Sequence, residues 1–238
     1  MILALIGVVL ADDTEDIIRL LDATDDLARG ESSVATLTME VKTARYERSV
    51  TMKAWSKGTE KSLIVIESPA KEKGVATLKV DDDIWNYLPK VDRTMKIPAA
   101  MMGGAWMGSH ITNDDIVKGS RMSEDYTAKL LERPEDGADR YVIELVPNPD
   151  APVVWGKVVV TVGGDELPVS TEFFDEKGNI VRTMLYQDVR TLDGRTMPTT
   201  FMVVPADHPD EYTKIRYDDI DFDVDLPEQT FTLQALKQ

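Results

Sequence analysis

Hydrophobic residues near the start of the chain recur at three- and four-residue spacing. Between residues 14 and 28 the apolar positions include Ile17, Leu20, Leu21 and Leu27, which fall on one face of a helix. Acidic residues fill the first turn of this segment and a glycine follows its end, as is usual at helix termini. The pattern therefore predicts one amphipathic helix over residues 14–28.

After residue 30 the periodicity changes to two, which is typical of strands. About eleven or twelve short segments alternate in this way and are separated by turns rich in Gly, Pro and Asp. They span residues 34–43, 48–55, 62–69, 76–80, 83–89, 126–132, 140–147, 154–162, 168–175, 180–189, 196–205 and 212–224. Short helical pieces are expected around residues 98–119. The chain is thus predicted to be mainly β (α+β), with one antiparallel domain over residues 12–238 whose long sheet must curl or close.

Several of these strands carry large apolar residues on both faces. Examples are residues 64–66, 158–160 and 202–204. In an antiparallel sheet with one face exposed to solvent, each strand should alternate apolar and polar residues. Two explanations remain open at this point: other elements cover both faces, or the concave side holds an apolar ligand.

Residues 101–120, "MMGGAWMGSHITNDDIVKGS", combine methionines and a tryptophan with four glycines and then two adjacent carboxylates. A catalytic loop, a metal site and a hydrophobic lid are the candidate explanations. Methionine thioethers can bind Cu(I), but they also pack adaptably where a surface must accept varied apolar partners. Asp114 and Asp115 could form a metal or acid–base site, whereas a cap at Thr112 or Asn113 of a short helix explains them more simply. A mobile lid over an apolar concavity is the interpretation that fits this composition best.

Charge and composition remove several classes of function. The formal net charge is -16 and the sequence pI is about 4.5, so no nucleic acid partner is expected, because Lys and Arg must neutralise phosphates. The absence of cysteine excludes disulfides, zinc–cysteine sites and lipid-modified cysteine. The two histidines, His110 and His208, are too far apart for a histidine-based metal motif. Neither a phosphate-binding loop nor a nucleophile elbow is present, so we expect no enzyme, no cofactor and no metal.

Residues 2–10 form an apolar run, and Val9-Leu10-Ala11 resembles a signal-peptidase site before Asp12. The run is too short to cross a bilayer as a helix. Residues 1–11 are therefore interpreted as the remnant of a signal peptide, which predicts export to the periplasm of a Gram-negative-type envelope. A buried N-terminal strand is the alternative.

Five short motifs resemble the outer-membrane lipoprotein-sorting protein family (LolA-like). They are W-x-K-G at 55–58, P-x-K-x-K-G at 69–74, W-x-Y-x-P at 85–89, M-M-x-G-x-W-M-G-S at 101–109 and N-D-D at 113–115. The similarity runs from about residue 35 to the C-terminus. It implies a single-domain periplasmic carrier whose fold is a curved, incomplete antiparallel β-barrel, with helices plugging the open side and acyl chains bound between sheet and helices.

The resemblance also implies a site and partners. Large apolar side chains on the strands and lid are the candidates for binding the ligand: Trp55, Ile66, Trp85, Tyr87, Met101, Met102, Trp106, Met107, Phe174, Met184 and Tyr186. Asn113, Asp114 and Asp115 are expected to anchor the lid, by capping or by pairing with an arginine such as Arg93 or Arg121. The expected partners are lipoprotein or lipid acyl chains, an inner-membrane exporter and an outer-membrane acceptor, with a monomeric carrier between them. The alternative function is a non-catalytic accessory subunit of a lipid exporter that docks through residues 101–109.

Overall fold

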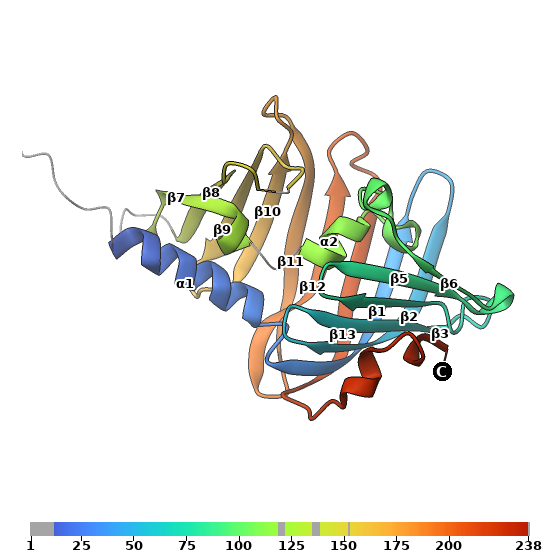
Figure 1. The fold of residues 1–238 in the computed structure, drawn as a ribbon. Coiled ribbons are helices and arrows are strands. Elements are labelled where there is room, and N and C mark those ends of the chain that lie inside the picture. Colours follow the sequence, from blue (N-terminus) through green and yellow to red (C-terminus); the bar gives the residue numbers. More distant parts are fainter. Residues whose placement is uncertain (1–11, 119–121, 135–138, 152, 238) are drawn as a thin grey trace, which may run out of the picture.

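The structure is a computed structural model, which describes residues 12–118, 122–134, 139–151 and 153–237. One long helix, α1 (Asp12–Asp26), opens the chain, and a single large sheet follows (Figure 1). The strands are β1 (Ser32–Lys42), β2 (Glu47–Lys57), β3 (Lys61–Ser68), β4 (Ala76–Val80), β5 (Asp83–Leu88), β6 (Arg93–Lys96), β7 (Tyr126–Glu132), β8 (Arg140–Pro147), β9 (Lys157–Gly163), β10 (Pro168–Phe174), β11 (Ile180–Leu192), β12 (Arg195–Pro205) and β13 (Tyr212–Phe222). The remaining helices are short: η1 (Pro89–Val91), η2 (Ala99–Met101), η3 (Trp106–Gly108), α2 (Asn113–Lys118), α3 (Met122–Asp125), η5 (Glu228–Phe231) and η6 (Ala235–Lys237).

All thirteen strands belong to one antiparallel sheet that curves but does not close. Its order is β6-β5-β4-β3-β2-β1-β13-β12-β11-β10-β9-β8-β7, so the two halves of the chain are joined where β1 pairs with β13. The edge strands β6 and β7 are consecutive in sequence but lie at opposite edges. The segment between them therefore has to pass across the open side of the sheet, and it carries η2, η3, α2 and α3.

The inner face of the sheet carries two apolar clusters. In the first, Met39 of β1, Met52 of β2 and Ile215 of β13 pack with Trp106 and Ile111 from the segment that crosses the sheet. In the second, the apolar stripe of α1 packs on strands β7 to β10. That stripe consists of Ile17, Leu20 and Leu21, and its partners include Ile143, Leu145, Val158 and Phe173. The half-buried Met184 of β11 packs against both clusters.

The outer face of β2 to β5 is covered by the C-terminal segment. Phe231 and Leu236, which belong to η5 and η6, pack with Leu63 and Leu78 in a third cluster. This cover explains why β3 is apolar on both faces: Ile64 faces inward, and its neighbours Leu63 and Val65 face the C-terminal segment. For this part of the sheet, the cover accounts for the apolar outer face without any ligand.

The elements predicted from the sequence are present with few changes. The helix and the twelve strand segments are confirmed, and η2, η3 and α2 lie in the region where short helices were expected, whereas η1, α3, η5 and η6 were not predicted. The thirteenth strand, β6, was missed because Arg93–Lys96 is only four residues long and mostly polar. The interpretation of residues 1–11 lies outside the described residues. Within the described ranges, no helix has both the length and the apolarity that crossing a membrane requires.

Candidate functional site

A partly enclosed cavity of about 440 Å³ lies on the inner face of the sheet. Its floor comes from β1, β2, β3 and β9 to β13, and its other walls come from α1, α2 and α3. Apolar floor residues include Leu37, Ala54, Ile64, Met184 and Phe201. The size falls in the range of about 300–1,000 Å³ that is typical of small-molecule sites. The cavity is mostly apolar and is bounded by separate helical elements on its open side.

We call residues 98–119 the lid, and its described part, residues 98–118, forms one wall of this cavity. Trp106 is 1% exposed and donates a hydrogen bond from Nε1 to Thr77 Oγ1 over 3.0 Å. The carbonyl oxygens of Met107 and Gly108 accept hydrogen bonds from Arg48 and Tyr46. These contacts tie the lid to β4 and to the start of β2.

The lid is also tied to β13. The backbone N–H of His110 donates to Thr213 Oγ1 over 2.8 Å, and its Nδ1 lies 2.9 Å from the same oxygen. His110 Nε2 lies 3.2 Å from Glu211 Oε2. The pKa of Glu211 is lowered by hydrogen bonds from the Ala44 N–H and from His110. Glu211 is therefore stabilised as a carboxylate, which lies within hydrogen-bonding distance of the His110 imidazole.

Helix α2 begins with a capping box. Thr112 Oγ1 accepts a hydrogen bond from the Asp115 N–H over 3.1 Å, and Asp115 Oδ2 accepts one from the Thr112 N–H over 2.8 Å. Asn113 is buried, and its amide group donates to the carbonyl oxygens of Met101 and Gly104. The predicted cap is thus present at Thr112, and the amide of Asn113 holds the turn before α2 in shape.

Asp115 forms an ion pair, but with a different arginine from those expected. Arg182 of β11 reaches both of its carboxylate oxygens, at 2.7 and 2.6 Å, and the Arg182 side chain is only 6% exposed. Arg93 lies exposed on the edge strand β6, so the pairing with Arg93 was wrong, and Arg121 lies outside the described residues. Burial alone would raise the pKa of Asp115, but hydrogen bonds from Arg182 and Thr112 bring it below its usual value. Both Asp114 and Asp115 line the cavity.

Aromatic rings enclose the same guanidinium group. The Arg182 Cζ atom lies 4.6 Å from the ring centroid of Trp155 and 4.3 Å from that of Phe173. Such contacts stabilise a cation that has been removed from water. Arg182 was not among the predicted site residues, although it shares the inward face of β11 with Met184, two residues further along. That alternation was the signal that could have identified it.

A second charged group lies where α1 ends. Asp25 Oδ2 and Arg29 Nη2 are 3.8 Å apart, and both residues line the cavity. The Asp25 side chain is 39% exposed, but the protein walls around it displace much of the surrounding water. This burial raises the pKa of Asp25 to about 6, against the lowering effect of Arg29. Burial also raises the pKa values of two tyrosines that line the cavity, Tyr186 and Tyr217.

The predicted ligand-binding residues divide into two groups. Those that line the cavity are Trp55, Trp106, Met184 and Tyr186. Trp55 also packs against the C-terminal cluster on the outer face. No ligand contact is shown for any of them, so their binding role stays a prediction.

The other predicted residues do not line the cavity. Trp85 and Tyr87 belong to the outer cluster beneath the C-terminal segment, because their register with Leu78 and Ala76 places them on that face. Ile66 is fully buried in the first inner cluster, and Met107 packs against the edge of this cluster. Met101 is 57% exposed and Met102 is half-buried. Phe174 lies at the end of β10 beneath the Lys157 ammonium group.

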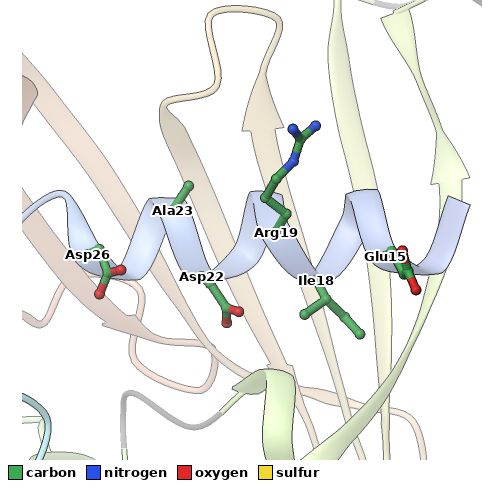
Figure 2. A pocket seen from close by; sticks show the side chains of 6 residues that line it. All are labelled: Glu15, Ile18, Arg19, Asp22, Ala23 and Asp26. Carbon is green, nitrogen blue, oxygen red and sulfur yellow. The ribbon is translucent and has the colours of Figure 1, made fainter. Parts of the chain in front are cut away.

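A shallow depression on α1 is a weaker candidate site. Figure 2 shows its six lining residues, Glu15, Ile18, Arg19, Asp22, Ala23 and Asp26, all from the one helix. In the described part of the chain no other element lines it, so it does not enclose a ligand as the inner cavity does. Across the described part of the chain, no group of three or more His, Asp or Glu side chains is placed to hold a metal ion.

The chain belongs to a family described as "uncharacterized protein", whose model matches residues 58–238. No curated protein matches the chain. Three solved structures are similar over nearly their whole length.

An outer membrane lipoprotein-sorting protein domain from Vibrio parahaemolyticus is 25% identical with a TM-score of 0.79, and the match covers 94% of this chain and 100% of that one. A LolA superfamily protein from Nitrosomonas europaea is 25% identical with a TM-score of 0.73, and the match covers 91% and 97%. A DUF1329 family protein from Desulfovibrio piger is 24% identical with a TM-score of 0.82, over 94% and 98%. This last likeness shows the fold.

Proposed function

We propose that this chain, whose fold is similar to those of an outer membrane lipoprotein-sorting protein domain and a LolA superfamily protein, is a periplasmic carrier that binds the acyl chains of a lipid or lipidated protein. The proposal includes shuttling of this cargo toward the outer membrane by a monomeric protein. An inner-membrane exporter would load the cargo and an outer-membrane acceptor would receive it. The protein would act without catalysis.

The observation that carries this proposal is the apolar cavity beneath the lid. It lies where the first inner cluster, which contains Trp106 of the lid, meets the second, which contains the apolar stripe of α1, so that it is bounded by the curved sheet and by separate helices. Most of its floor residues have aliphatic, aromatic or thioether side chains, which bind methylene groups without specific geometry. This arrangement suits a flexible hydrocarbon chain.

The energetics explain why such a carrier is useful. Each buried CH₂ group contributes roughly 0.8 kcal/mol, so a long acyl chain is costly to expose to water. Spontaneous transfer between two membranes is slow for this reason. A water-soluble protein that encloses the chain lowers this barrier, provided that the lid opens during loading and release.

The test is a variant that fills the cavity. Ala54 of β2 lines the floor and is half-buried, so Ala54→Trp would place a large ring where the acyl chain is expected. Binding would be measured with a fluorescent acyl probe and by native mass spectrometry of protein purified from the periplasm. We expect Ala54→Trp to lose probe binding while keeping a cooperative thermal unfolding transition.

The matched control is Ala23→Trp, because Ala23 lies on the outer side of α1 and does not line the cavity. This variant should bind the probe as the parent protein does. Purified parent protein that carries no lipid and takes up no acyl probe would overturn the carrier proposal. That result would favour the accessory subunit of a lipid exporter, with residues 101–109 as its docking surface.

A further inference from the structure

Negatively charged residues outnumber positively charged residues in the described lining of the cavity. The lining includes five aspartates, Asp22, Asp25, Asp114, Asp115 and Asp125, but only two arginines, Arg29 and Arg182. Among the described residues no lysine lines the cavity. Asp25 and Asp115 face the two arginines and Asp114 has a polar partner of its own. Among the described residues, Asp22 and Asp125 therefore supply the remaining negative charge around a mostly apolar floor.

Both arginines already have carboxylate partners. Arg182 is bound by Asp115 through two hydrogen bonds and is stacked on two aromatic rings. Arg29 lies 3.8 Å from Asp25. An incoming anion would have to compete with these pairs for the terminal nitrogens, which leaves only the buried Nε–H of each arginine without a hydrogen-bond partner among the described residues.

The C-terminal end of α1 adds to the negative field. Residues 21–29, which include the last turn of this helix, contribute seven of the residues that line the cavity. No basic side chain lies in that last turn, where helix carbonyl groups carry partial negative charge. Asp22 and Asp25 lie on the same stretch, and Asp125 of α3 lines the cavity from a second helix. The negative groups therefore lie on the helical side, opposite the apolar floor.

We propose that the cavity selects amphiphiles with a cationic headgroup, such as a quaternary ammonium or amine, over those with an anionic headgroup. This inference rests on the proposed function, because it names the class of ligand for the same cavity. The acyl chain lies along the floor of the sheet, and the headgroup lies beside the C-terminal half of α1 and α3. A cation there gains attraction to the excess carboxylates, in surroundings that screen charge less than bulk water does. An anion meets repulsion at the same place.

Three single-chain ligands with the same dodecyl tail test this selection, all used below their micelle concentrations. They are dodecyltrimethylammonium, dodecyl maltoside and dodecylphosphonate, which carry cationic, uncharged and anionic headgroups. Calorimetry of the whole chain should show the ammonium ligand bound about tenfold more tightly than the phosphonate, with the maltoside between them. Equal affinities, or tighter binding of the phosphonate, would overturn the selection but leave the carrier proposal intact. Binding of none of the three would overturn both.

Two variants separate a local effect from the net charge of the protein. The double variant Asp22→Asn/Asp125→Asn should reduce the preference for ammonium over phosphonate by about tenfold. A control, Asp16→Asn/Asp82→Asn, removes the same charge at exposed positions that do not line the cavity, and should keep the preference. An equal loss in both variants would show that the overall charge of -16 is responsible, and would overturn the proposal.

The preference should also depend on pH. The charged groups near Asp25 are Asp22 and Asp26 on α1 and Arg29 in the turn that follows, and the uncharged but titratable Tyr186 of β11 also faces it. Because the pKa of Asp25 is about 6, its charge is lost on acidification before those of the exposed carboxylates. The ammonium preference should therefore be smaller at pH about 5 than at pH about 8, and Asp25→Asn should remove most of this change. An unchanged preference between the two pH values would count against a headgroup beside Asp25.

Discussion

Arg182 of β11 donates hydrogen bonds from both of its terminal nitrogens to the two carboxylate oxygens of Asp115 in α2, over 2.7 and 2.6 Å. The two residues are far apart in the sequence, and their contact joins the lid to the second half of the sheet. Thr112 supplies two further hydrogen bonds to the same carboxylate. The lid is therefore held at α2 by a buried ion pair within a network that also caps the helix.

Removal of one partner of this pair should be strongly destabilising. Asp115→Asn leaves the buried guanidinium group of Arg182 without its counter-ion, a change that costs about 3–5 kcal/mol when such a pair is broken. Urea unfolding followed by circular dichroism would measure the loss. Acyl-probe uptake by the same variant would show whether the anchored lid is also needed for binding.

An exposed ion pair supplies the control for that prediction. Lys96 and Asp83 are 2.7 Å apart, but both side chains are about half exposed. Asp83→Asn should cost less than about 1 kcal/mol, because solvent screens pairs of this kind. Equal effects of Asp115→Asn and Asp83→Asn would contradict the anchoring role of Asp115.

The sequence predicted the strands well because their alternation is a local property. Val158, Val160 and Val162 of β9 point to the same face, and all are buried in the α1 cluster. The pairing of distant elements is not encoded in this way. Asp115 was expected to anchor the lid by capping or by pairing with an arginine, but the sequence does not distinguish Arg93 from Arg182 as the partner until the order of the strands is known. The choice depends on the lid passing over β11, which only the assembled sheet shows.

The site could be predicted only in part for a related reason. Alternation shows that Tyr87 and Leu78 have buried positions, but not which face of the sheet is inside. The C-terminal segment covers their face and makes it a second core. A sequence rich in apolar residues on both faces is therefore compatible with a cavity on either side, and the C-terminal cover decides which face remains open to a ligand.

Trp106→Phe should weaken the attachment of the lid without creating a large cavity in the first inner cluster. The phenyl ring keeps much of the buried contact but loses the hydrogen bond from Nε1 to Thr77 Oγ1. Thr77 keeps its other hydrogen bond, to Asn86 Oδ1, so the expected loss is about 1–2 kcal/mol. Trp106→Ala should cost about 3–5 kcal/mol, because it also leaves a cavity. Chemical unfolding of the two variants would check this order, and similar losses would show that the hydrogen bond dominates.

Gly108→Ala tests the backbone of the lid. Gly108 has φ +70°, and a Cβ atom at this position would lie 3.3 Å from the Tyr46 hydroxyl oxygen. The substitution should cost about 1–2 kcal/mol through the left-handed conformation alone. Gly103 lies in the same segment, has no positive φ, and has open space around its Cα. Gly103→Ala should therefore be neutral or slightly stabilising, and equal losses of thermal stability at the two glycines would contradict this account.

The pH dependence of stability should reveal Asp25. Its pKa is raised from 3.8 to about 6 by burial, so the folded state binds more protons than the unfolded state between these pH values. The contribution of Asp25 to stability is thus fully present below pH about 4 and is lost as the pH rises through about 6. Asp25→Asn cannot ionise, so relative to the parent protein it should gain stability on going from pH about 4 to pH about 7. Thermal unfolding across this range would measure the gain, with Asp26→Asn on the same turn as the exposed control. Parallel pH profiles for the parent protein and Asp25→Asn would show that this carboxyl is hydrated as fully in the folded state as in the unfolded chain.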